Sequence, residues 1–126
     1  MIAVSEILRD RIDYEELTAA GLKGNFDELM YKICIIRYLY GKPMIINSGY
    51  RSVQQNRDAG GATKSNHLTC QAVDVKDLTG DFWQWCMANL ELFVKLGLYF
   101  EDRSSTPRWV HIQTVPPASG DRIFKP

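Results

Sequence analysis

The chain has 126 residues, of which 45% are hydrophobic and 24% are charged, a composition typical of a globular protein. This length corresponds to about one domain, so we expect a single domain over residues 1–126. Fifteen basic residues balance fifteen acidic ones without a basic cluster, which argues against a nucleic-acid-binding protein. No apolar run approaches the roughly 20 residues that a membrane-spanning helix needs, so we expect no membrane insertion.

The cysteine count and the N-terminal residues bear on the compartment. The three cysteines, Cys34, Cys70 and Cys86, cannot all pair within one chain, and their spacing is not that of a small secreted disulfide framework. We therefore expect reduced thiols. The N-terminal segment carries a charge by residue 6 and lacks the apolar centre of a signal peptide, which predicts synthesis in the cytoplasm. The sequence leaves the oligomeric state open.

Three separate helices are predicted in the N-terminal part of the chain. Short helices are expected over residues 6–10 and 14–20, and Asn25 and Glu28 have the spacing of a capping box that would begin a longer helix. An apolar face follows at near-helical spacing, formed by Phe26, Leu29, Ile33, Ile36 and Leu39. Gly41, with Pro43 shortly after it, predicts the end of that helix.

The middle of the chain alternates between short strands and a long polar segment. Residues 44–46 predict a short buried strand, and residues 48–66, rich in Gly, Ser, Asn and Arg, predict a long loop of the kind that is often functional. Residues 71–75 alternate in polarity, which predicts a strand with Val73 and Val75 facing inward and Asp74 on the opposite face.

The C-terminal part predicts one helix, one hairpin and an irregular tail. The helix is expected over residues 81–96, with Gly97 as its stop, and the hairpin joins residues 98–101 to residues 109–114. Pro and Gly in the last eleven residues indicate irregular structure. The sum is an α+β fold, with a small antiparallel sheet and flanking helices.

Three polar residues stand out as candidate metal ligands. The chain has only two histidines, His67 and His111, and alternation places His111 and Asp74 on the polar faces of their strands. Two imidazoles and a carboxylate suit a catalytic zinc site, which uses three protein ligands and leaves one position open. Spacing alone leaves another interpretation open, in which each histidine is merely hydrogen-bonded and Asp74 pairs with an arginine, because no general metal motif such as HExxH is present.

Several segments resemble one enzyme family. Residues 65–74 read SNHLTCQAVD and resemble the SxHxxGxAxD signature of the M15 zinc D-Ala-D-Ala peptidases, whose fold is shared with the Hedgehog signalling domain. Residues 47–52, NSGYRS, are similar to the family's SGYRS segment, and Asn56 with Gly-Gly-Ala at 60–62 resembles the stretch that follows it. Trp109-Val110-His111 looks like the family's last ligand strand. The order and spacing fit over residues 25–126.

The resemblance implies both a function and roles for named residues. It implies a zinc ion held by His67, Asp74 and His111, a substrate contact from Arg51, and a wall of the site at Ser65. In such enzymes the metal polarises the scissile carbonyl and activates water. The implied substrate is a peptide bond of peptidoglycan stem peptides, cut by a D-Ala-D-Ala carboxypeptidase or an endolysin-type endopeptidase.

The resemblance also implies where the protein acts. The size of the chain and the expected lack of a signal peptide favour a phage or prophage origin. The protein would then act on the cell wall after release or as a virion component.

Two departures from the family pattern bear on catalysis. Cys70 stands where the family has glycine, and the carboxylate expected just before the last histidine is absent, since those positions hold Arg108 and Trp109. A hairpin loop over residues 103–107 would pair Glu101 with Trp109 and put Glu101 on the His111 face, a diagonal neighbour within reach of a glutamate. We therefore expect Glu101 to be the general base and acid, although a register slip of one residue would exchange it for Asp102.

Two alternative functions follow from these departures. The missing carboxylate beside His111 favours a zinc-stabilised structural or interaction domain without catalysis. Cys70 suggests a metal ligand, because His67-x-x-Cys70 has ligand-like spacing, or a cysteine nucleophile. A thiolate ligand would close the position that catalysis needs open, and a nucleophile at residue 70 would have its neighbours occupied by metal.

Overall fold

A five-stranded sheet forms the centre of the computed structural model, which describes residues 2–9 and 11–126. The strand order is β1-β2-β4-β3-β5. The strands are β1 (Ile46–Ser48), β2 (Ala72–Lys76), β3 (Tyr99–Glu101), β4 (Trp109–Gln113) and β5 (Ile123–Phe124). The helices are α1 (Val4–Leu8), α2 (Tyr14–Ala19), α3 (Lys23–Tyr40), α4 (Val53–Asp58), α5 (Asp81–Ala88) and α6 (Leu90–Leu96). The predicted α+β class is confirmed.

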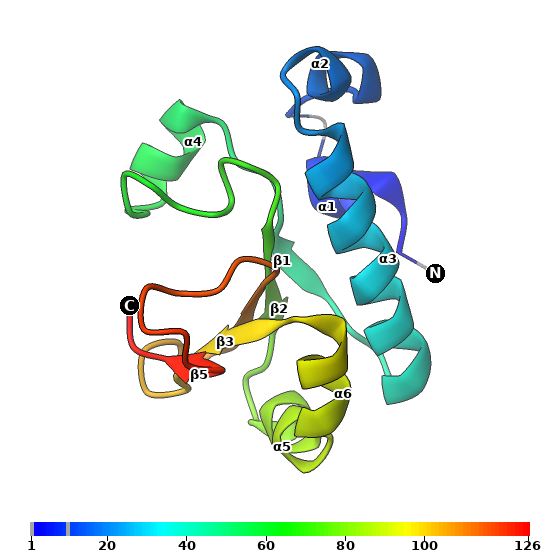
Figure 1. The fold of residues 1–126 in the computed structure, drawn as a ribbon, viewed down its shortest axis with the longest axis vertical. Coiled ribbons are helices and arrows are strands. Elements are labelled where there is room, and N and C mark those ends of the chain that lie inside the picture. Colours follow the sequence, from blue (N-terminus) through cyan, green and yellow to red (C-terminus); the bar gives the residue numbers. More distant parts are fainter. Residues whose placement is uncertain (1, 10) are drawn as a thin grey trace.

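Helices α1 and α3 lie on one side of the sheet, and α4 lies on the other together with irregular segments, among them the C-terminal segment (Figure 1). Residues from β2, β3 and β4 face the helices and are almost fully buried: Val73, Val75, Phe100, Val110 and Ile112. The rings of Phe93 and Phe100 meet with centroids 4.7 Å apart, which joins α6 to the sheet. This packing buries the inward faces of β2 and β4, which are interior strands of the sheet. None of the helices in the described parts of the chain is both long and apolar enough to span a membrane.

Helices α1 and α3 begin earlier than predicted, whereas α2 begins at Tyr14, as predicted. The helix expected over residues 6–10 begins at Val4, and residue 10 lies outside the described residues. The prediction of a capping box at Asn25 and Glu28 was wrong, because α3 begins at Lys23 with Leu22 as its N-cap. The Asn25 side chain instead donates a hydrogen bond to the Thr69 carbonyl, 3.1 Å away. The side chain predicted to cap the helix therefore makes a tertiary contact. Gly41 ends α3 in the left-handed conformation, as predicted.

The long loop predicted over residues 48–66 contains a helix. Ser52 caps α4, accepting from the Gln55 amide at 3.2 Å, while the Gln55 side chain accepts from the Ser52 amide at 2.9 Å. This capping box begins the helix in a segment whose composition indicated a loop. The preceding strand also lies later than predicted, at Ile46–Ser48 instead of residues 44–46.

The single helix predicted over residues 81–96 is two helices. Asn89 leaves the helical conformation at φ −119° and ψ 30°, and its side chain donates to the Trp85 carbonyl at 2.8 Å. An asparagine that bonds to the backbone of the preceding turn competes with helix continuation, which explains the break. Gly97 ends α6, as predicted.

The C-terminal strands correct two expectations. In the hairpin, Tyr99 pairs with Gln113 and Phe100 with Ile112, so the register is two residues away from the predicted pairing of Glu101 with Trp109. A shift of two keeps every side chain on its predicted face. The tail is not wholly irregular, because β5 pairs with β3 in parallel and makes the sheet mixed.

Candidate metal centre and active-site cleft

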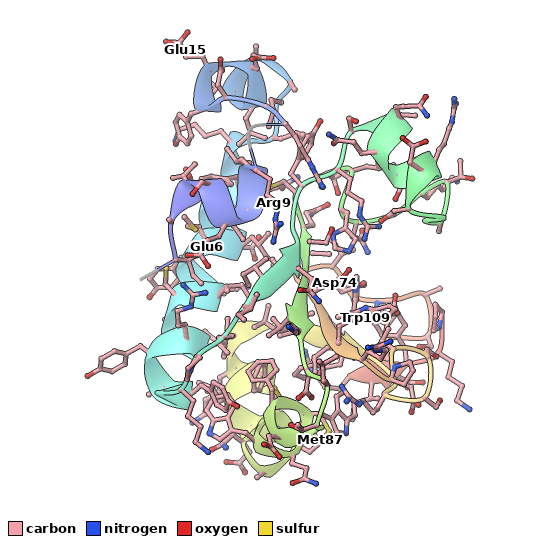
Figure 2. The ribbon with its side chains drawn as sticks, turned by 180° about the vertical axis from the view of Figure 1, so that it is seen from behind. Glu6, Arg9, Glu15, Asp74, Met87 and Trp109 are labelled. Atoms are coloured by element: carbon pink, nitrogen blue, oxygen red, sulfur yellow. The ribbon has the colours of Figure 1, made fainter. Side chains whose placement is uncertain are left out.

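Two neighbouring strands position the first two site residues. Asp74 of β2 and His111 of β4 are direct partners in the antiparallel register. Val73 and Ile112, the next pair, point into the core, so alternation turns Asp74 and His111 to the opposite face. Figure 2 shows Asp74 near the middle of the molecule, with Trp109 close to it. Both side chains therefore project from interior strands of the sheet.

A compact turn before β2 brings His67 to the same place. The His67 carbonyl accepts from the amides of Arg51 and Cys70 at 3.1 and 3.3 Å, which ties the turn to the segment after β1. The His67 ring makes its own contact to that segment, because Nδ1 lies 2.7 Å from the Gly49 carbonyl. A carbonyl only accepts, so Nδ1 carries a proton, and in the neutral ring the lone pair is on Nε2.

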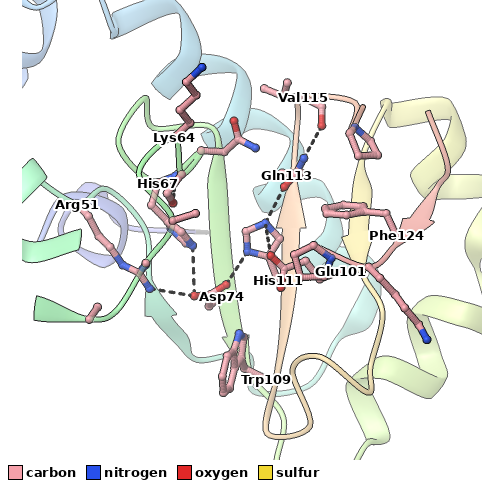
Figure 3. Close-up of a pocket in the computed structure, with 18 of the residues that line it drawn as sticks. Arg51, Lys64, His67, Asp74, Glu101, Trp109, His111, Gln113, Val115 and Phe124 are labelled. Atoms are coloured by element: carbon pink, nitrogen blue, oxygen red, sulfur yellow. Dashed lines mark hydrogen bonds and ion pairs between the residues drawn. The ribbon is translucent and has the colours of Figure 1, made fainter. Parts of the chain in front are cut away.

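The three predicted ligands meet at this point. His67 Nε2 lies 3.3 Å from Asp74 Oδ2, and His111 Nδ1 lies 2.9 Å from Asp74 Oδ1. One potential ligand atom from each residue lies within 4.8 Å of the others, and all three residues are buried. Figure 3 shows the side chains converging from the loop and from the two strands. Two imidazoles and one carboxylate, with a protonated ring nitrogen anchored elsewhere, fit a divalent metal ion such as zinc.

The electrostatics of the site favour a charged carboxylate. Burial by itself would raise the pKa of Asp74, but the hydrogen bonds and charges of His111 and His67 outweigh burial and hold the pKa well below its ordinary value. Burial would lower the pKa of His111, whereas the contact with Asp74 raises it above its ordinary value. In the chain without metal, Asp74 is thus an anion flanked by the two imidazoles.

Arg51 reaches the same centre from the segment before α4. Its guanidinium Nη2 lies 3.3 Å from Asp74 Oδ2 and its Nε lies 2.9 Å from Ser48 Oγ. Nη1 lies 3.5 Å from Asn56 Oδ1, and a Cβ at Gly61 would collide with that oxygen, which gives a physical reason for glycine there. The Arg51 side chain is only 16% exposed, so its ion pair with Asp74 lies inside the site and not on the open surface.

Glu101 lies beside His111, as the sequence predicted. Its Oε1 is 3.8 Å from His111 Nε2, and continuing the observed register places Glu101 directly across from His111 instead of diagonally. Asp102 instead accepts from the Ser104 hydroxyl and amide in the loop after β3. The structure therefore brings Glu101, and not Asp102, to the candidate metal centre.

A cleft of about 650 Å³ opens over these residues. Arg51, Ser65 and Glu101 line it together with the three candidate ligands. The Ser65 hydroxyl accepts from the His67 amide at 3.2 Å, so Ser65 both lines the cleft and holds the ligand turn. Lysines also line the cleft, at positions 64 and 125.

The structure is needed to assign the roles of Gln113 and Cys70. Gln113 bonds to the His111 ring, a contact that the sequence analysis did not identify although alternation along one strand puts both side chains on the same face. Cys70 is fully buried in the hydrophobic core cluster and is not a member of the group that could hold a metal. Burial raises the pKa of the Cys70 thiol to about 12, so a ligand or nucleophile role for Cys70 is not supported.

Comparisons with known proteins identify the family. A stretch of 61 residues, 48% of this chain, is 36% identical to the zinc D-Ala-D-Ala carboxypeptidase of Streptomyces albus G, and it covers 24% of that protein. The fold is similar to the crystal structure of Serratia marcescens L-Ala D-Glu endopeptidase ChiX, with a TM-score of 0.54 and 21% identity over 86% of this chain and 95% of that chain. The profile of the Peptidase M15 family matches residues 4–113, and the chain therefore belongs to the peptidase M15 family.

Proposed function

We propose that this protein is a zinc-dependent peptidase that hydrolyses peptide bonds in peptidoglycan stem peptides. The observation that carries the proposal is the convergence of His67, Asp74 and His111 in a cleft that also contains a carboxylate, Glu101. Membership in the peptidase M15 family and the similarity to a zinc D-Ala-D-Ala carboxypeptidase support the reaction and the metal. The chain spans about a quarter of the length of that relative, so the substrate is part of the proposal.

His67, Asp74 and His111 would hold the zinc ion. A zinc ion in such a site supplies Lewis-acid polarisation of a carbonyl and lowers the pKa of water. The three residues present N, O and N donors, and the anchoring of His67 Nδ1 on Gly49 turns its free nitrogen toward Asp74. The residues present therefore fit the metal.

Glu101 and Arg51 supply the remaining chemistry. The Glu101 carboxylate lines the cleft beside His111, where it can accept a proton from the attacking water and pass it to the leaving amine. The Arg51 guanidinium, held by Ser48 and Asp74, can donate charge-assisted hydrogen bonds to a substrate carboxylate or to the oxygen that becomes negative.

The test is digestion of isolated peptidoglycan, with the released fragments identified by mass spectrometry. The zinc-loaded protein should release stem-peptide products, and chelation should abolish release until zinc is restored. His67→Ala should neither bind zinc stoichiometrically nor release product. Release of free D-alanine would indicate a carboxypeptidase, and release of longer fragments an endopeptidase. Intact peptidoglycan after incubation with fully zinc-loaded protein would contradict the proposed function.

The place of action is a further part of the proposal. A wall peptidase that acts after release, as a phage lysis enzyme or a virion component would, should attack walls from outside. Added protein should therefore lyse bacteria whose outer membrane has been permeabilised. Activity on isolated walls without lysis of such cells would argue against this part alone.

A further inference from the structure

We infer that Gln113 is a positioning residue that fixes the tautomer of His111 and so presents its Nδ1 lone pair to the metal. This inference rests on the proposed zinc site. Gln113 is 4% exposed and follows His111 by two residues on β4, so both side chains project from the same face. The Gln113 Oε1 lies 2.8 Å from His111 Nε2, on the side of the ring away from Asp74.

The orientation of the Gln113 amide follows from its second partner. The Gln113 Nε2 lies 2.7 Å from the Val115 carbonyl. A carbonyl cannot donate, so the amide nitrogen must face Val115 and the amide oxygen must face His111. The amide oxygen can only accept, which places a proton on His111 Nε2. Without metal, the 2.9 Å contact of Nδ1 with the Asp74 Oδ1 carboxylate needs a second proton, on Nδ1. In the neutral ring that a metal would bind, the Nε2 proton is kept and the lone pair is on Nδ1.

His67 shows the complementary arrangement. Its Nδ1 donates to the Gly49 carbonyl, so in the neutral ring the lone pair is on Nε2, which faces Asp74. In their neutral forms the two imidazoles therefore have opposite tautomers, and each would present an unprotonated nitrogen to a metal at the same point. The acceptor for His67 is a backbone carbonyl, whereas the acceptor for His111 is a side chain that a substitution can remove.

The same contact leaves Glu101 free. Glu101 Oε1 lies 3.8 Å from His111 Nε2, which is longer than a hydrogen bond, while Gln113 occupies that N–H at 2.8 Å. A carboxylate bonded to the ring would be less able to take a proton from water. Gln113 therefore satisfies the N–H without using the general base.

Zinc affinity and the ring protons of His111 test the inference without reference to catalysis. Gln113→Leu should weaken zinc binding by about 10- to 100-fold in competition with a chelator, the usual effect of removing a hydrogen-bond partner of a ligand. Gln113→Glu keeps an acceptor and should recover most of the loss. Gln71→Leu is the matched control, because Gln71 immediately precedes β2, the strand beside β4, and its side chain bonds to Thr69, not to the ring. It should bind zinc like the wild type.

Nitrogen-15 spectra of the zinc-loaded protein give the second readout, since the chain has only two histidines. The wild type should show one ring protonated at Nδ1 and one at Nε2, and Gln113→Leu should lose the slowly exchanging Nε2 proton of His111. Wild-type zinc affinity in Gln113→Leu, an equal loss in Gln71→Leu, or two rings protonated at the same position would overturn the inference. A protein with the expected spectra that leaves peptidoglycan intact would contradict the proposed function and not this inference.

Discussion

At the scale of single residues, the site depends on what each side chain faces. Glu101 and Asp102 are adjacent carboxylates, yet only Glu101 lines the cleft, because alternation along β3 turns Asp102 toward Ser104. At Cys70 the notable feature is the backbone conformation and not what the side chain faces. Cys70 has φ +58°, a left-handed conformation that glycine adopts without strain.

Replacing Glu101 tests the general base. Glu101→Gln should retain zinc but lower the turnover of peptidoglycan peptides by about 10²- to 10⁴-fold, because an amide cannot take the proton. Asp102→Asn is the matched control and should change turnover little, since Asp102 is bonded within its own loop. Steady-state kinetics compare the turnover of both variants with that of the wild type. Equal and negligible losses would mean that Glu101 is not the base.

Substitutions at Cys70 test the backbone strain. Cys70→Gly and Cys70→Ala both remove the thiol, but only glycine relieves the left-handed strain, which costs roughly 1–2 kcal/mol. Cys70→Gly should therefore be more stable than Cys70→Ala by about 1 kcal/mol in urea unfolding, after the greater unfolded-state freedom of glycine is subtracted. The opposite order of stability would show that the turn tolerates a side chain without strain.

At the scale of elements, α1 contacts the backbone segment that holds His67. The Ile7 carbonyl of α1 accepts from the Tyr50 amide at 2.8 Å, immediately next to the Gly49 carbonyl that holds His67. A Cβ at Gly49 would lie 2.5 Å from the Ile7 carbonyl oxygen. The close approach of the two backbones explains why glycine is needed at this position.

Gly49→Ala should separate α1 from the site. The added methyl must displace the backbone of Ile7, so we expect a loss of about 1–3 kcal/mol in unfolding free energy, together with weaker zinc binding through His67. Gly24→Ala is the control, because a Cβ at Gly24 of α3 meets no atom within 4 Å. It should stabilise the protein by about 0.5–1 kcal/mol. Unchanged stability in Gly49→Ala would mean that α1 moves without cost.

At the scale of the whole molecule, the metal would connect segments that lie far apart in the sequence. The candidate ligands come from the turn before β2, from β2 and from β4, and Glu101 comes from β3. A bound ion would link these segments in the folded state only, because the unfolded chain does not hold the three ligands together.

Zinc should therefore stabilise the fold. Binding at a free zinc concentration 100 times the dissociation constant should add about 2.7 kcal/mol, which corresponds to a rise of roughly 10 °C in melting temperature. Calorimetry with and without chelator measures the rise. His111→Ala should show no such dependence on zinc, and a full zinc-induced rise in that variant would contradict the ligand assignment.

The sequence by itself determined the local patterns. The period of two along β2 and β4 placed Asp74 and His111 each on the polar face of its own strand. The glycines at 41 and 97 marked helix ends because left-handed positions favour glycine. These features depend on neighbours within a few residues, and the printed sequence contains those neighbours.

Only the tertiary structure decided the contacts between distant segments. The register of β3 against β4 depends on the whole connecting loop, and the observed pairing differs by two residues from the predicted one. The hydrogen bond from Asn25 to the Thr69 carbonyl and the pairing of β5 with β3 likewise join residues far apart in the chain. The partner of each ring nitrogen, Gly49 for His67 and Gln113 for His111, follows from the same packing. Such contacts depend on the relative placement of whole elements, which no local periodicity specifies.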